Sequence, residues 1–152
     1  MSDPDLRTTH RGLRVFDVEL PDLDPAAAPA MPDLLFAVWL GHAIDTGVRE
    51  PHATTLSTVD AEGRPRSRVL LLRRLTEGRC GFATSRTSRK GGELDVRPWS
   101  TLNFYWPQVG RQIRVRGRVI DSGPEEAAGD FLARPHGSRA ESWAGEPEPG
   151  AA

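Results

Sequence analysis

Two basic clusters flank a run of apolar side chains, and they are the residues of this sequence best suited to chemistry. The first cluster lies in SRVLLLRR at positions 67–74, and the second lies in TSRKGGEL at positions 87–94. Arginine, lysine and hydroxyl side chains bind phosphate groups through charge-assisted hydrogen bonds. The composition of the two segments therefore predicts a site for an anion.

The second cluster coincides with an expected helix start. A helix that begins near Ser88 would carry Arg89 and Lys90 in its first turn, where the helix dipole disfavours cations. A bound phosphate would resolve this conflict, because the first backbone N–H groups of a helix also lack intrahelical acceptors. We expect the hydroxyls of Thr87 and Ser88 to join the site. The alternative is that the two cations form a solvated helix face.

The bulk composition excludes several classes of function. The 152 residues include 20 basic and 21 acidic side chains, and the net charge of -1 provides no general attraction to nucleic acids. A single cysteine, Cys80, rules out an intrachain disulfide, and the four histidines lack metal-ligand spacing. No apolar run approaches the length of a membrane span, and the N-terminus lacks a signal-like core. We therefore expect a cytoplasmic protein without a metal or a membrane partner.

Helices and short strands must position the two clusters. Apolar residues at helical spacing predict a helix over 33–47, and Ser88 and Pro124 indicate the starts of two more helices, over 88–97 and 122–134. Alternating or continuous apolar runs bounded by turn residues predict five strands, over 52–59, 66–74, 79–85, 101–106 and 111–121.

These elements predict a mainly β protein with flanking helices, organised as a small antiparallel barrel. The continuous apolar run 69–72 indicates a central strand that is buried on both faces. We expect a flexible arm over residues 1–30, a single domain over 31–143, and a disordered tail over 144–152.

Four motifs carry a resemblance to a known family. They are RVLLLR at 68–73, SRKGGEL at 88–94, FYWPQVGRQIRVRGRV at 104–119 and FLARPHGS at 131–138. In this order they resemble the pyridoxine/pyridoxamine 5'-phosphate oxidase family, whose fold is an FMN-binding split β-barrel and which forms homodimers. The resemblance covers residues 33–143, and we expect the chain to lack the C-terminal segment of the family.

The resemblance implies that FMN binds at the homodimer interface. The residues that would bind the cofactor are Arg68, Val69, Leu70, Leu71, Arg73, Ala83, Thr84, Ser88, Arg89, Lys90 and Gln112, with Gln112 reaching across from the partner subunit.

The same resemblance implies a substrate site. Arg73 and Arg134 would be catalytic. Both would bind the substrate, together with Asp130 and Ser138. Two positions depart from the family pattern. Arg73 stands where lysine is usual, and Asp130 stands where a tyrosine usually faces the substrate phosphate.

The implied activity is the oxidation of pyridoxine or pyridoxamine 5'-phosphate to pyridoxal 5'-phosphate, with O2 as the acceptor and H2O2 as a product. One alternative is an FMN-dependent oxidase that acts on an aromatic ring of secondary metabolism, as in the phenazine pathway. Another is a flavin-binding protein without turnover. A nucleic-acid-binding barrel is disfavoured by the near-neutral charge and the 7% aromatic content.

Overall fold

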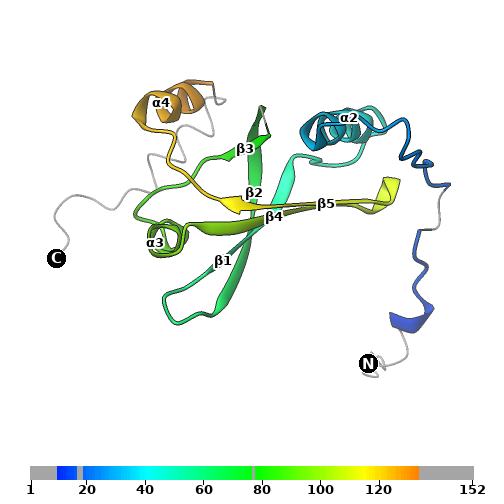
Figure 1. Cartoon of the computed structure of the whole chain (residues 1–152). Coiled ribbons are helices and arrows are strands. Elements are labelled where there is room, and N and C mark those ends of the chain that lie inside the picture. The colour runs from blue at the N-terminus through cyan, green and yellow to red at the C-terminus, as the bar shows by residue number, and fades with distance from the viewer. Residues whose placement is uncertain (1–9, 17–18, 77, 134–152) are drawn as a thin grey trace.

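The computed structural model describes residues 10–16, 19–76 and 78–133. Five strands and three α-helices make up most of these residues, together with two short 3-10 helices (Figure 1). The elements in chain order are η1 His10–Gly12, α2 Pro32–Asp45, β1 Ala53–Val59, β2 Pro65–Thr76, β3 Arg79–Phe82, α3 Arg89–Val96, β4 Trp99–Trp106, η2 Pro107–Val109, β5 Arg111–Arg118 and α4 Pro124–Leu132.

The strands form one antiparallel sheet in the order β3-β2-β1-β4-β5. The sheet curls into a half-barrel, so that β4 and β5 cross the direction of β1 and β2 (Figure 1). The prediction of a mainly β, antiparallel fold with flanking helices is confirmed. The barrel is not closed, because within the described residues the edge strands β3 and β5 do not pair with each other.

Two tight connections fix the register of the sheet. Val59 of β1 pairs with Pro65 of β2 across a turn in which the Asp60 carboxylate accepts the N–H of Arg64 at 2.8 Å. Gly110 joins η2 to β5 with a φ of 59°, a left-handed conformation that favours glycine. Both connections contain residue types that favour turns.

A bulge interrupts the pairing of β2 with β3. Leu72 lies opposite Phe82, whereas Arg74 lies opposite Gly81, so Arg73 is the extra residue on its strand. Arg74 extends to α4, where its guanidinium forms an ion pair with Glu126 at 2.8 Å. The bulge therefore lies where β2 meets the last described helix.

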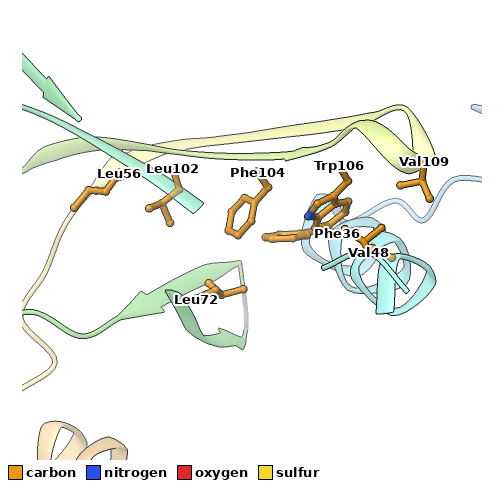
Figure 2. Packing of buried hydrophobic residues seen from close by; sticks show 9 residues of the cluster. Phe36, Val48, Leu56, Leu72, Leu102, Phe104, Trp106 and Val109 are labelled. Atoms are coloured by element: carbon orange, nitrogen blue, oxygen red, sulfur yellow. The ribbon is translucent and has the colours of Figure 1, made fainter. Parts of the chain in front are cut away.

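The core lies between α2 and the inner face of the sheet. Phe36 of α2 packs against Phe104 of β4, with ring centroids 4.9 Å apart, and Trp106 lies beside both rings (Figure 2). The helix expected from the spacing of its apolar residues is confirmed as α2, in which Phe36 and Ala43 are buried. Figure 2 also shows Leu56, Leu72 and Leu102 continuing this apolar layer along the sheet.

The prediction that the apolar run of β2 is buried on both faces is wrong for the described chain. Leu72 is buried, but Val69, whose side chain points to the other face, is 69% exposed. Within the described residues, α2 packs on the face of the sheet that carries Leu72, whereas the face of β2 that carries Val69 stays exposed. A continuous apolar run in the sequence therefore does not require that both faces of the strand are buried within this chain.

The N-terminal segment makes contacts near η2 and β5. The Leu20 side chain lies against Gly110, and the Arg111 guanidinium stacks on the Trp39 ring of α2, with its central carbon 4.3 Å from the ring centroid.

No described helix is both long and apolar enough to cross a membrane. The predicted tail over 144–152 lies outside the described residues.

Trp106→Phe is expected to destabilise the fold by about 1–2 kcal/mol. The Trp106 indole N–H donates to the Pro51 carbonyl at 2.9 Å, and the variant keeps most of the apolar volume but leaves this partly buried carbonyl without its donor. Urea unfolding measures the difference. Trp39→Phe is the matched control, because Trp39 is only partly buried, its indole N–H forms no hydrogen bond within the described residues, and phenylalanine keeps an aromatic face for Arg111, so stability should change by less than about 0.5 kcal/mol. Equal effects of the two substitutions would contradict the role of this hydrogen bond.

Candidate functional site

The start of α3 is built as the sequence indicates. Ser88 is the N-cap residue, and its Oγ accepts the N–H of Gly91 at 3.3 Å. The same hydroxyl donates to the Ser85 carbonyl at 2.6 Å, which ties the helix start to the preceding loop. The N–H groups of Arg89 and Lys90 have no intrahelical acceptor, as at any helix start. The first turn carries no acidic side chain.

Gly91 allows the helix to approach this loop closely. A Cβ atom at Gly91 would lie 2.7 Å from the Ser85 carbonyl oxygen and even closer to that of Arg86. Real Cβ atoms essentially never approach oxygen so closely, and both obstacles are backbone atoms that cannot rotate away. Glycine at this position therefore fixes the distance between the loop and the first turn of α3.

An open hollow of about 450 Å³ lies between the start of α3 and β2. Arg66 and Arg68 reach it from the inner face of the sheet, since they pair with Thr58 and with the buried Leu56 on β1. Figure 1 shows α3 and α2 at opposite ends of β4 and β5, so the helix that borders the hollow is not the one that packs on the apolar core. The residues that line it are Arg66, Ser67, Arg68, Ser88, Arg89 and Lys90.

The cations of this hollow differ in their partners. Across the described residues, neither Arg89 nor Lys90 forms an ion pair. Arg68 is engaged, because its Nη2 donates to Glu93 Oε2 at 2.7 Å and its Nη1 donates to Thr58 Oγ1 at 2.5 Å. The two uncompensated charges are therefore those at the helix start.

Two carboxylates lie beneath the arginines. Glu93 is 6% exposed, and its Oε2 accepts the Thr58 hydroxyl as well as Arg68. Arg66 lies between Glu93 and Asp60, with nitrogen-to-oxygen distances of 3.4 Å to each. Although Glu93 Oε1 lacks a well-aligned hydrogen bond, the nearby Arg66 guanidinium still offsets its charge.

These contacts lower the pKa values of both carboxyl groups. The pKa of Glu93 is held below its usual 4.5 mainly by the Thr58 hydrogen bond, with Arg68 and Arg66 adding to the effect against desolvation. The pKa of Asp60 is lowered chiefly by the backbone N–H of Arg64. Both groups are therefore ionised at neutral pH.

The fold should accordingly lose stability in acid. A carboxyl whose folded-state pKa is depressed stabilises the fold fully above its unfolded pKa, and this stabilisation disappears as the pH falls through the folded value. For Glu93 the loss should begin below about pH 4.5. We expect Glu93→Gln to be less stable than wild type by about 1–2 kcal/mol at neutral pH, with the difference shrinking toward pH 3.5. Denaturant unfolding across this range tests the expectation, and a gap that stays constant would contradict it.

The predicted cofactor residues fall into three groups. Arg68, Ser88, Arg89 and Lys90 meet at the hollow. Leu70 and Leu71 continue β2, and Ala83 and Thr84 begin the loop that leads to α3, where Thr84 Oγ1 lies 3.3 Å from Ser88 Oγ.

Three further predicted residues do not line the hollow. Val69 faces the outer side of the sheet and Arg73 occupies the bulge. Gln112 lies on β5, separated from β2 by β1 and β4, and its amide nitrogen donates to Asn103 at 2.9 Å. Its expected contact to the cofactor from a partner subunit stays a prediction.

The predicted substrate residues are described only in part. Asp130 belongs to α4, which the ion pair between Arg74 and Glu126 holds near the bulge that carries Arg73. Arg134 and Ser138 lie outside the described residues. The described part of the chain holds no group of three or more His, Cys, Asp or Glu side chains that could bind a metal ion.

Sequence reasoning missed the acidic layer beneath the arginines. The sequence alone indicates an ordinary solvated helix residue at Glu93, because its neighbours Gly92 and Asp95 are small or polar. The available signal was on β1, where Thr58 follows Leu56 on the same face of the strand. A threonine on a buried face requires a hydrogen-bond partner, and Glu93 supplies it.

Comparison with known proteins decides the family. Residues 40–152 match the family model described as pyridoxamine 5'-phosphate oxidase. The chain belongs to this family. The recognition made from the four motifs is therefore confirmed.

Curated members of the pyridoxamine 5'-phosphate oxidase family are close in sequence. The pyridoxine/pyridoxamine 5'-phosphate oxidase of Paraburkholderia xenovorans (strain LB400) is 41% identical over 125 residues, which are 82% of this chain and 59% of that protein. The protein of the same name from Pseudomonas fluorescens (strain Pf0-1) is 44% identical over 124 residues, 80% of this chain and 58% of that protein. The chain thus spans less than two thirds of the length of these relatives.

Solved structures agree with the fold of the pyridoxamine 5'-phosphate oxidase family. PhzG from Burkholderia lata 383, in complex with tetrahydrophenazine-1-carboxylic acid, superposes with a TM-score of 0.79 and 30% identity, covering 88% of this chain and 67% of PhzG. A pyridoxamine 5'-phosphate oxidase-related, FMN-binding protein from Nostoc punctiforme PCC 73102 gives a TM-score of 0.60 at 22% identity, covering 87% of this chain and 68% of that chain. The second likeness supports the fold alone.

The residues of the hollow fit a flavin phosphate. Arg89 and Lys90 supply two charges without ion-pair partners in the described structure, and the helix start supplies N–H donors and a favourable dipole for an anion. The close approach permitted by Gly91 places the loop hydroxyls beside these donors. A phosphate monoester carries about two negative charges near neutral pH, which matches the two uncompensated cations.

Proposed function

We propose that this chain binds FMN in the hollow at the start of α3 and forms the cofactor-binding part of an oxidase for pyridoxine or pyridoxamine 5'-phosphate. The observation that carries the proposal is the meeting of Arg68, Ser88, Arg89 and Lys90 around one hollow. Identity above 40% to proteins named pyridoxine/pyridoxamine 5'-phosphate oxidase supports the choice of activity.

Arg89 and Lys90 would hold the flavin phosphate together with the N–H groups of the first turn of α3. When bound, FMN would accept a hydride from the substrate and pass the electrons to O2, which yields H2O2. Arg73 is a candidate for contact with the substrate, since it is exposed at the bulge of β2. Its fixed positive charge would attract a phosphate or a carboxylate of the substrate.

We also propose that the chain functions as a homodimer. The outer face of the sheet leaves Val69, Trp99 and Tyr105 more than half exposed, although their residue types favour burial. A second copy packed on this face would cover them and would explain the apolar run of β2. Sedimentation equilibrium should give twice the chain mass, and a purely monomeric protein at micromolar concentration would contradict the dimer.

A turnover assay tests the proposed reaction. The FMN-loaded protein should release H2O2 when pyridoxine 5'-phosphate or pyridoxamine 5'-phosphate is added, with formation of pyridoxal 5'-phosphate. Pyridoxine without phosphate is the matched control substrate and should react more slowly. An FMN-loaded protein that releases no peroxide from any substrate of a panel would be a flavin-binding protein without turnover.

A second candidate is the oxidation of a reduced aromatic ring of the phenazine type. The likeness to PhzG, whose structure contains tetrahydrophenazine-1-carboxylic acid, favours it. Asp130 favours it as well, since a carboxylate in a phosphate pocket would repel a phosphorylated substrate. Faster peroxide release from a dihydrophenazine carboxylate than from the B6 phosphates would select this candidate.

A further inference from the structure

Two side chains of the protein form hydrogen bonds to the guanidinium of Arg68. Its Nη2 donates to Glu93 Oε2 at 2.7 Å, and its Nη1 donates to Thr58 Oγ1 at 2.5 Å. The Thr58 hydroxyl donates to the same Glu93 oxygen. The three side chains therefore close a triangle of hydrogen bonds beneath the hollow.

Two of the three side chains in this triangle are buried. Thr58 is 1% exposed and Glu93 is 6% exposed, whereas Arg68 remains partly open at the hollow. Guanidinium has five N–H donors in a fixed plane, and two of them are used by Glu93 and Thr58. The other donors of the same planar group remain for a ligand, and their orientation is set by the two that are clamped.

We propose that Glu93 is a positioning residue that orients Arg68 toward the phosphate of the cofactor. This inference rests on the FMN binding proposed above and concerns a residue outside the predicted site. Without the clamp, the long arginine side chain would have to lose its rotamer freedom on binding, which weakens the contact to the phosphate. Glu93 would thus act on affinity through Arg68 without touching the cofactor.

The charges of the hollow agree with this role. Glu93 and Asp60 offset Arg68 and Arg66, so that the net charge on the ligand side comes from Arg89 and Lys90. A hollow with four uncompensated cations would bind any polyanion. The buried acids therefore leave Arg68 as an oriented donor and limit the excess charge to that of a phosphate monoester.

The phosphate contribution can be isolated by comparing FMN with riboflavin, which lacks the phosphate. Dissociation constants of both ligands follow from flavin fluorescence on apoprotein, for wild type, Glu93→Ala, Glu93→Gln, Arg68→Ala and the double variant Arg68→Ala/Glu93→Ala. In Glu93→Ala the preference for FMN over riboflavin should fall about tenfold or more, while riboflavin affinity changes little. Glu93→Gln should keep the preference within about threefold, because its carboxamide oxygen can accept the same bonds. The preference of the double variant for FMN over riboflavin should be at least as large as that of Arg68→Ala.

Asp95→Ala is the matched control, since it removes an exposed carboxylate from the same helix and leaves Arg68 and Glu93 untouched. A Glu93→Ala protein that keeps its preference for FMN, or that weakens both ligands equally, would overturn the positioning role. A preference that rises would do the same, since Glu93 would then act only by opposing the phosphate charge. Wild-type apoprotein that binds FMN no better than riboflavin would overturn the proposed phosphate site itself, and the inference with it.

Discussion

Replacing both Arg89 and Lys90 with alanine is expected to give a protein that purifies without colour and binds FMN about a hundredfold or more weakly than wild type. The two side chains are the cations of the hollow that lack ion-pair partners in the described structure. A charge-assisted hydrogen bond contributes about 1.5–3 kcal/mol, so that the loss of two such contacts reaches this magnitude. The ratio of flavin absorbance to protein absorbance after reconstitution and desalting measures the result.

The fold itself should tolerate this double substitution. Both side chains lie at the surface of the first turn, and alanine has a higher helix propensity than either residue. The matched control is Arg49→Ala/Arg79→Ala, which removes two exposed cations that do not line the hollow and should bind FMN like wild type. Normal flavin content in the Arg89→Ala/Lys90→Ala protein would show that the phosphate lies elsewhere.

Gly91→Ala is expected to destabilise the protein by about 2–3 kcal/mol and to weaken FMN binding together with stability. The new Cβ would collide with the backbone carbonyls of Ser85 and Arg86, so either the loop or the first turn of α3 must move. The same movement would disturb the Ser88 cap, whose Oγ bonds both to Ser85 and to Gly91. Thermal unfolding and FMN titration measure the two effects.

The neighbouring glycine provides a sharp control. A Cβ at Gly92 would meet nothing within 4 Å, and alanine there should stabilise the helix by up to about 1 kcal/mol. The two substitutions add the same methyl group one residue apart on the same helix, yet they should have opposite signs. A Gly91→Ala protein as stable as Gly92→Ala would contradict the close approach of the loop to α3.

Local rules predicted most elements of the fold because each rule acts over a few residues. The start of α3 at Ser88 follows from capping chemistry, and the β1–β2 turn follows from the Asp60 to Gly63 run. Packing decides what local rules cannot. The apolar run around Val69 suggested burial on both faces, but which face is covered depends on how far the sheet curls and on what packs against it.

In the candidate site, too, some features follow from local sequence and others depend on packing. The position of Arg89 and Lys90 in the first turn of a helix could be predicted from sequence, because the capping residue Ser88 and the two cations are consecutive. The pairing of Arg68 with Glu93 joins residues 25 positions apart, on a strand and a helix, and depends on how α3 lies against β1. No periodicity or motif in the sequence indicates a contact between two residues so far apart in the chain. Arg68, which the family resemblance implied as a cofactor ligand, is therefore already hydrogen-bonded by Glu93 and Thr58.

Titration of the wild-type apoprotein with FMN tests the central claim most directly. The account predicts saturable quenching of flavin fluorescence at one FMN per chain, with an affinity that falls as salt concentration rises, because the phosphate is held by exposed cations. Flavin fluorescence that stays unchanged as protein is added would contradict the assignment of the hollow at the start of α3 as a cofactor site.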